Sequence, residues 1–147
     1  MEIKKVVEKN FGSKIDERIG FEIRNDKIYF FNKELKNIYE FLRLKGLKVE
    51  KLGIYFGRLK KNEKIQLSIE GAQFVGKDAK KNLIKIDNFE KLIKFLKGEE
   101  SLEISNNVEK HNFPIVKYKD YIICSAASLE NEIKSLFPKN PRKMLFE

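Results

Sequence analysis

The sequence predicts a mixed α+β fold, in which short helices are interleaved with short strands. Three observations support this prediction. The chain of 147 residues is 41% hydrophobic and holds 12 Phe, which is enough to build a packed core. Apolar residues recur at helical spacing in several segments, and these segments end at glycines. Short runs rich in Ile, Tyr and Phe lie between the helical segments and are typical of strands.

Four helices are predicted, at residues 3–11, 33–45, 69–76 and 89–97. The last three follow side chains that accept hydrogen bonds at helix starts, which are Asn32, Ser68 and Asn88. The first, second and fourth end at Gly12, Gly46 and Gly98. The clearest pattern belongs to the second helix, where Leu35, Ile38, Tyr39 and Leu42 share one face.

The remaining apolar segments predict strands. The Asn25-Asp26 turn joins residues 21–24 and 27–31 into a hairpin, and a second hairpin places Val49, Ile54 and Phe56 before a basic turn at 58–64. Further strands are expected at 65–67, 83–86, 102–104, 114–118 and 121–126. Lys119-Asp120 would form a two-residue turn, although it lacks the glycine that such turns favour.

The net charge of +9, from 31 basic and 22 acidic residues, favours anionic partners. Basic residues are concentrated at 58–64, 77–85 and 134–143. Aromatic residues near these segments could stack on nucleic-acid bases, namely Tyr118, Tyr121 and Phe137. This combination is what RNA binding requires, although lysines at turns also serve simply to keep a protein in solution.

Several kinds of chemistry are disfavoured by the residues available. The single cysteine, Cys124, lies in an apolar run typical of a buried thiol, and the single histidine, His111, lies in a polar stretch typical of a surface loop. No glycine-rich turn marks a cofactor site, so no cofactor, no metal and no catalytic centre are expected. Acidic residues that could together bind a metal are Asp16, Glu17, Asp78, Asp87, Glu99 and Glu100.

The same sequence also predicts where in the cell the protein is located. The longest apolar runs fall far short of a membrane-spanning helix, and the N-terminal residues carry charge where a signal peptide would be apolar. We therefore expect a cytoplasmic protein that does not contact membranes.

Three stretches carry a resemblance to a known family. They are the run from Lys51 to Leu67, the helix ending Phe95-Leu96-Lys97-Gly98-Glu99, and the segment from Lys134 to Lys139. Together they resemble a PUA-like module. Similar domains are the RNA-binding domain of the Fmu/Sun (RsmF-like) rRNA cytosine-5 methyltransferases and the PUA ribosome-assembly factor of the archaeal and eukaryotic large subunit. This sequence departs from that pattern at Tyr121, Ile123 and Ser125, where relatives often carry glycines.

The resemblance implies a fold in two parts. A small N-terminal α/β region, pre-PUA-like and spanning residues 1–75, would pack on a C-terminal PUA-like β-barrel with short helices at residues 76–147. The methyltransferase relatives carry their catalytic residues in another domain, so the resemblance implies a non-catalytic RNA-binding protein. Its partner would be structured rRNA or tRNA, in ribosome biogenesis or RNA modification, together with an RNA-modifying enzyme or an assembly factor.

The predicted phosphate contacts fall into two groups. The main group holds Lys97, Lys117, Lys119, Lys134, Lys139, Arg142 and Lys143, and the second holds Arg58, Lys60 and Lys61. One alternative is a protein–protein interaction module of an assembly complex. A metal-dependent nuclease is the weaker alternative.

Overall fold

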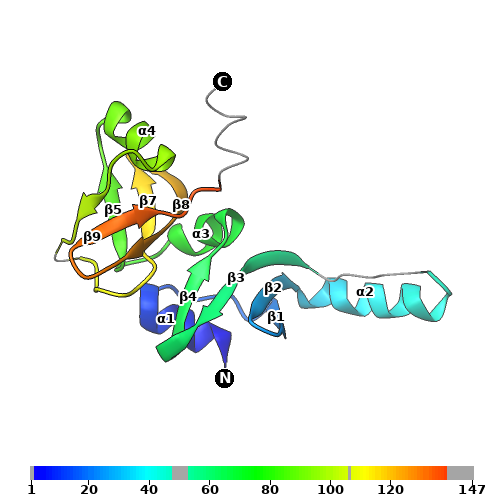
Figure 1. The fold of residues 1–147 in the computed structure, drawn as a ribbon. Helices are drawn as coiled ribbons and strands as arrows, with labels where there is room; N and C mark the ends of the chain where they lie inside the picture. The colour runs from blue at the N-terminus through cyan, green and yellow to red at the C-terminus, as the bar shows by residue number, and fades with distance from the viewer. Residues whose placement is uncertain (1, 48–52, 106, 139–147) are drawn as a thin grey trace.

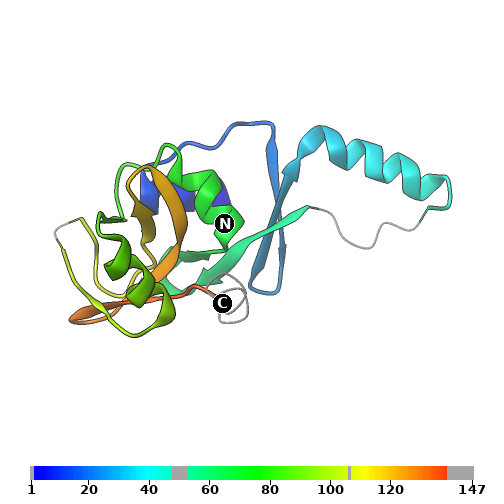
Figure 2. The same ribbon diagram turned by 90° about the horizontal axis from the view of Figure 1, so that it is seen from above.

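The computed structural model describes residues 2–47, 53–105 and 107–138. These residues form two β-sheets and four α-helices, so the predicted mixed α+β class is confirmed. Both sheets lie in the body of the molecule, whereas helix α2 projects away from it (Figures 1 and 2).

The four helices lie where the sequence places them. Their bounds are α1 Ile3–Phe11, α2 Lys33–Leu44, α3 Ile69–Gly76 and α4 Phe89–Lys97. The predicted caps form. The side chains of Asn32, Ser68 and Asn88 accept hydrogen bonds from backbone N–H groups in the first turns of α2, α3 and α4. None of the described helices is both long enough and apolar enough to cross a bilayer.

The first sheet is antiparallel and follows chain order, β1-β2-β3-β4. Its strands are β1 Ile19–Arg24, β2 Lys27–Asn32, β3 Ile54–Lys60 and β4 Lys64–Leu67. The predicted basic turn at 58–64 is wrong at its start, because Arg58 and Lys60 lie within β3. Asn62 and Glu63 adopt φ of 61° and 55°, which tightens the turn to Lys61–Glu63 and lets Lys60 pair with Lys64. The predicted strand position Val49 lies outside the described residues.

The second sheet curls into a half-barrel with the order β5-β7-β8-β9-β6. Its strands are β5 Leu83–Ile86, β6 Leu102–Glu103, β7 Ile115–Tyr118, β8 Tyr121–Ser128 and β9 Glu132–Ser135. Strands β5 and β7 are parallel, and the other pairs are antiparallel. Strand β9 was not predicted, because Ile133 is the only apolar residue among its four.

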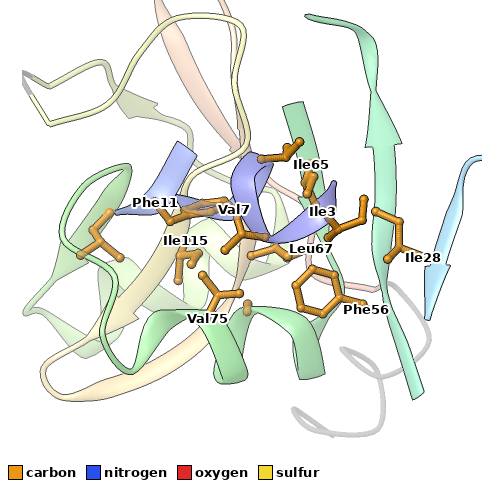
Figure 3. Close-up of a cluster of buried hydrophobic side chains, with 12 residues drawn as sticks. Ile3, Val7, Phe11, Ile28, Phe56, Ile65, Leu67, Val75 and Ile115 are labelled. Carbon is orange, nitrogen blue, oxygen red and sulfur yellow. The ribbon is translucent and has the colours of Figure 1, made fainter. Parts of the chain in front are cut away.

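A shared core joins the two sheets. Helix α1 buries Val7 and Phe11 completely, and these side chains pack with residues of both sheets, including Phe56 of β3 and Ile115 of β7 (Figure 3). Leu83 of β5 belongs to the same cluster. The predicted N-terminal and C-terminal regions are therefore packed together through one hydrophobic core, in which α1 and α3 lie against both sheets.

A second core fills the inside of the curled sheet. Helix α4 contributes Leu92, Phe95 and Leu96, which meet apolar residues of β5, β7, β8 and β9. Cys124 of β8 is buried here, as expected for a structural thiol, and Phe137 is also buried. This core fixes the start of α4 beside the end of β7.

Candidate nucleic-acid interface

The hairpin between β7 and β8 presents two tyrosines. The predicted two-residue turn forms, with Lys119 at φ 54°, so Tyr118 and Tyr121 pair directly across the hairpin. Positive φ is unfavourable for a residue with a side chain, and here it occurs without glycine. Tyr121 is 68% exposed, so most of its side chain is accessible to a ligand.

A third aromatic ring lies beside this hairpin. Phe89 is the first residue of α4, is 59% exposed and meets the Tyr118 ring at a centroid distance of 5.8 Å. The Nζ of Lys119 lies 5.3 Å from the centroid of the same tyrosine ring. Exposed rings and a cation at one turn are suited to stacking on bases and holding a phosphate.

Two more lysines extend the charge from the turn along the sheet. Lys85 of β5 and Lys117 of β7 are direct partners across adjacent parallel strands, so their side chains leave the same face of the sheet. This face is the opposite one to that of Tyr118, which follows Lys117 in β7 and packs against the second core. In the described part of the chain, neither these two nor Lys119 forms an ion pair within 4 Å. Adjacent like charges repel, and an anionic ligand relieves that repulsion. We name Lys85, Phe89, Lys117, Tyr118, Lys119 and Tyr121 the turn site.

The second predicted group of cations lies elsewhere. Arg58 is engaged by Asp26, whose Oδ2 lies 3.2 Å from the arginine Nε. The Nζ of Lys60 lies 5.8 Å from the ring centroid of Phe113, which precedes β7, and so Lys60 marks the opposite end of β7 from the turn site. Lys61 is exposed in the β3–β4 turn.

Two further predicted contacts that the structure describes, Lys97 and Lys134, do not join the turn site. Lys97 ends α4, about 12 Å along the helix from Phe89, and its charge suits the helix C-terminus. Lys134 of β9 pairs with Glu132 at 3.5 Å and lies beside Ala127, about 20 Å along β8 from Tyr121. Lys139, Arg142 and Lys143 lie outside the described residues, so their predicted role stays a prediction.

One predicted stacking residue is wrong and another was missed. Phe137 is only 5% exposed and packs in the second core, so its ring is not available to a base. The helical spacing of residues 89–97 places Phe89 on the same face as Leu92, yet Phe89 is exposed and lies outside the core. The one signal in the sequence is its position directly after the cap Asn88, where a side chain at the helix start often escapes the core.

A hollow next to the turn site carries mixed charge. It has a volume of about 880 Å³ and lies between β5 and β6, the two edge strands of the curled sheet. Lys85 and Lys91 line it, as do Glu100 and Glu103. Because its acids offset its lysines, the hollow itself is a poor anion site, and the positive charge is concentrated at the turn.

The candidate carboxylates are spread over the molecule. Among the described residues no three His, Cys, Asp or Glu side chains gather closely enough to hold a metal ion. Asp78 accepts a hydrogen bond from the Ser13 hydroxyl, and Glu100 lies 3.7 Å from the Nζ of Lys94. Asp16 is held by Arg18, whose guanidinium and backbone N–H both donate to its carboxylate.

The contact between Arg18 and Asp16 predicts a shift in the pKa of Asp16 that can be measured. The hydrogen bond from the Arg18 side chain, assisted by that from its backbone, lowers the pKa of Asp16 from 3.8 to about 2. Because the folded pKa is depressed, the contact stabilises the fold above pH 3.8 and is lost as the pH falls towards 2. In an NMR titration, Arg18→Ala should move the Asp16 midpoint upward. The control Arg24→Ala removes a separate pair with Glu22 and should leave it unchanged.

The sequence matches no known protein-family model, and no curated protein matches it.

Proposed function

We propose that the chain is a non-catalytic RNA-binding protein that acts on rRNA or tRNA in ribosome biogenesis or RNA modification. The observation that carries this proposal is the turn site, where Lys119 lies over the Tyr118 ring beside the exposed rings of Phe89 and Tyr121. Lys85 and Lys117, which form no ion pair with a described residue, add positive charge on the other face of the same strands. RNA recognition needs these elements, because phosphates bind cations and unpaired bases stack on aromatic side chains.

The architecture supports placing this site in a PUA-like domain. The proposal is supported by a curled half-barrel sheet, with α4 packed on it, in the part of the chain where a C-terminal barrel is expected, and by a second sheet in the expected N-terminal region. By the resemblance, such a chain docks on structured RNA and brings an RNA-modifying enzyme or assembly factor to it. The turn site would contact a loop or an end of that RNA, where bases are free to stack.

Salt dependence tests the phosphate contacts of the turn site. We expect the variant Lys85→Ala/Lys117→Ala/Lys119→Ala to bind RNA about tenfold more weakly. The slope of log K against log salt should fall by about 2, because each lost contact removes about 0.7 to 0.9 from it. The measurement is fluorescence anisotropy with a labelled tRNA transcript and a labelled oligouridine, between about 50 and 300 mM KCl.

A matched variant distinguishes RNA binding at the turn site from attraction of RNA by the net charge of the protein. Lys14→Ala/Lys33→Ala/Lys36→Ala removes the same charge from exposed lysines that lie outside the turn site, so it should change the affinity and the slope much less. Equal losses in the two triple variants would show that the net charge, rather than the turn site, attracts RNA. Undetectable binding of the unmodified chain at low salt would overturn the proposed function itself.

A protein–protein interaction module is the second candidate function. The observation that favours it is helix α2, which has no buried residue and exposes several large apolar side chains. Such a surface is suited to contact with protein rather than with phosphates. If the chain binds no RNA, this function becomes the better proposal.

A further inference from the structure

Helix α2 carries an apolar face that nothing in the described structure covers. None of its 12 residues is buried, and Leu35, Ile38 and Phe41 are 43%, 51% and 57% exposed. The helix begins beside β2 and then projects from the body of the molecule (Figures 1 and 2). An isolated helix of this length is only marginally stable in water, so a contact along its apolar face would stabilise it.

The side chains on this face form a narrow stripe. At about 100° per residue, Glu34, Ile38, Phe41 and Lys45 fall within roughly 60° of the helix circumference, and Leu42 borders them. The ends of the stripe therefore carry opposite charges, and its middle is apolar. Neither Glu34 nor Lys45 forms an ion pair within 4 Å with another residue that the structure describes.

Such a stripe is complementary to the same stripe of a second copy that runs in the opposite direction. In an antiparallel pair related by a twofold axis, Ile38 faces Phe41 of the second copy, and Glu34 faces Lys45 of the second copy. Symmetry repeats each contact, which is the property of an isologous dimer interface. A parallel pair would instead place Glu34 against Glu34 and Lys45 against Lys45, so the charges favour the antiparallel arrangement.

The exposed area agrees with a dimer. By the usual areas of large hydrophobic residues, Leu35, Ile38 and Phe41 leave roughly 300 Å² of apolar surface on each copy. Monomers seldom expose more than a few hundred Å² in one patch. Pairing two copies would bury roughly 600 Å² from these side chains alone, and flanking residues would supply the rest of the roughly 1,200 Å² of stable complexes.

We propose that two copies of this chain associate through α2, antiparallel, with the twofold axis passing between Ile38 and Phe41. The helix projects away from the body and from α4, so the pair leaves both turn sites accessible (Figures 1 and 2). The dimer does not depend on RNA binding, and each property can fail while the other holds.

Sedimentation equilibrium of the nuclease-treated full chain tests the association. Between about 5 and 500 µM, the unmodified chain should shift from monomer to dimer. Ile38→Asp should weaken this association at least about 100-fold, because it places a carboxylate in the middle of the apolar contact. Leu44→Asp is the matched control. Leu44 is 85% exposed but lies about 90° around the helix from the centre of the stripe, so Leu44→Asp should weaken association much less than Ile38→Asp.

Charge reversal tests the register. Glu34→Lys and Lys45→Glu should each weaken the dimer about tenfold, because each creates two like-charge contacts. The double variant Glu34→Lys/Lys45→Glu restores both pairs with reversed sign and should return the dissociation constant to within about twofold. A chain that stays monomeric throughout, including one that binds a different protein through α2, overturns the proposal. A double variant that associates as weakly as the two single variants also overturns the proposal.

Discussion

Alanine in place of both Phe89 and Tyr121 is expected to lower the affinity for single-stranded RNA about 100- to 1,000-fold. The two rings are 59% and 68% exposed and flank Tyr118 at the end of the hairpin. Stacking of a base on an aromatic side chain contributes about 1 to 3 kcal/mol, and two rings can hold two bases. Fluorescence anisotropy with a labelled oligouridine measures the loss.

The conservative double variant provides the control. Phe89→Tyr/Tyr121→Phe keeps both rings and should bind within about threefold of the unmodified chain, because stacking uses the ring faces. Both side chains are largely exposed, so the circular dichroism spectrum of the alanine variant should be unchanged. Unaltered affinity in the alanine variant would remove base stacking from the turn site and leave its lysines as the only contacts.

Phe56→Ala is expected to lower the free energy of unfolding by about 3 to 5 kcal/mol. Phe56 is fully buried in the shared core, and its ring lies 5.0 Å from that of Phe21 and 5.1 Å from that of Phe30, between centroids. Helix α3 crosses directly over this position. A Cβ on Gly71 would lie 2.1 Å from the Phe56 carbonyl oxygen, so the surrounding backbone is too tightly packed to close a cavity easily.

Urea unfolding followed by circular dichroism measures this loss. Phe89→Ala removes the same side chain from an exposed position and should change the stability by no more than about 0.5 kcal/mol. A loss below about 1.5 kcal/mol for Phe56→Ala would mean that the core collapses around the gap, contrary to the packing described above.

Local signals account for most of the fold that the sequence predicts correctly. Asn32, Ser68 and Asn88 mark helix starts because their side chains satisfy backbone N–H groups there, whatever the rest of the chain does. Gly12 and Gly98 mark helix ends because both adopt positive φ, at 66° and 82°. These effects act over a few residues, so they can be predicted from the local sequence alone.

Tertiary arrangement explains what the sequence does not reveal. The periodicity of α2 predicts a helix correctly, but it does not reveal that the apolar face has no partner within the described structure. Strand β9 depends on pairing with β6 and β8, and its own residues are mostly polar. The absence of a partner in the described structure decides the first outcome, and pairing with two other strands decides the second.

The candidate site also combines residues that local sequence brings together with residues that only the tertiary fold brings together. Lys117, Lys119, Tyr118 and Tyr121 are adjacent in sequence, and the predicted hairpin was enough to bring them together. Lys85 joins them only because β5 pairs in parallel with β7. The seven predicted cations that the structure describes are dispersed, since charge along a chain says little about which surface each side chain reaches.

The position of α1 in the shared core affects the order of events during synthesis. Asn10 of α1 meets Asn112, 102 residues later, at 3.5 Å, and Ile115 of β7 completes the packing around Phe11. At about 5 to 20 residues per second, the ribosome needs several seconds to make that segment after α1 has emerged. During that interval the apolar side of α1 has only the first sheet and α3 to cover it. The complete burial of Val7 and Phe11 seen in the finished core therefore requires that β7 has left the exit tunnel.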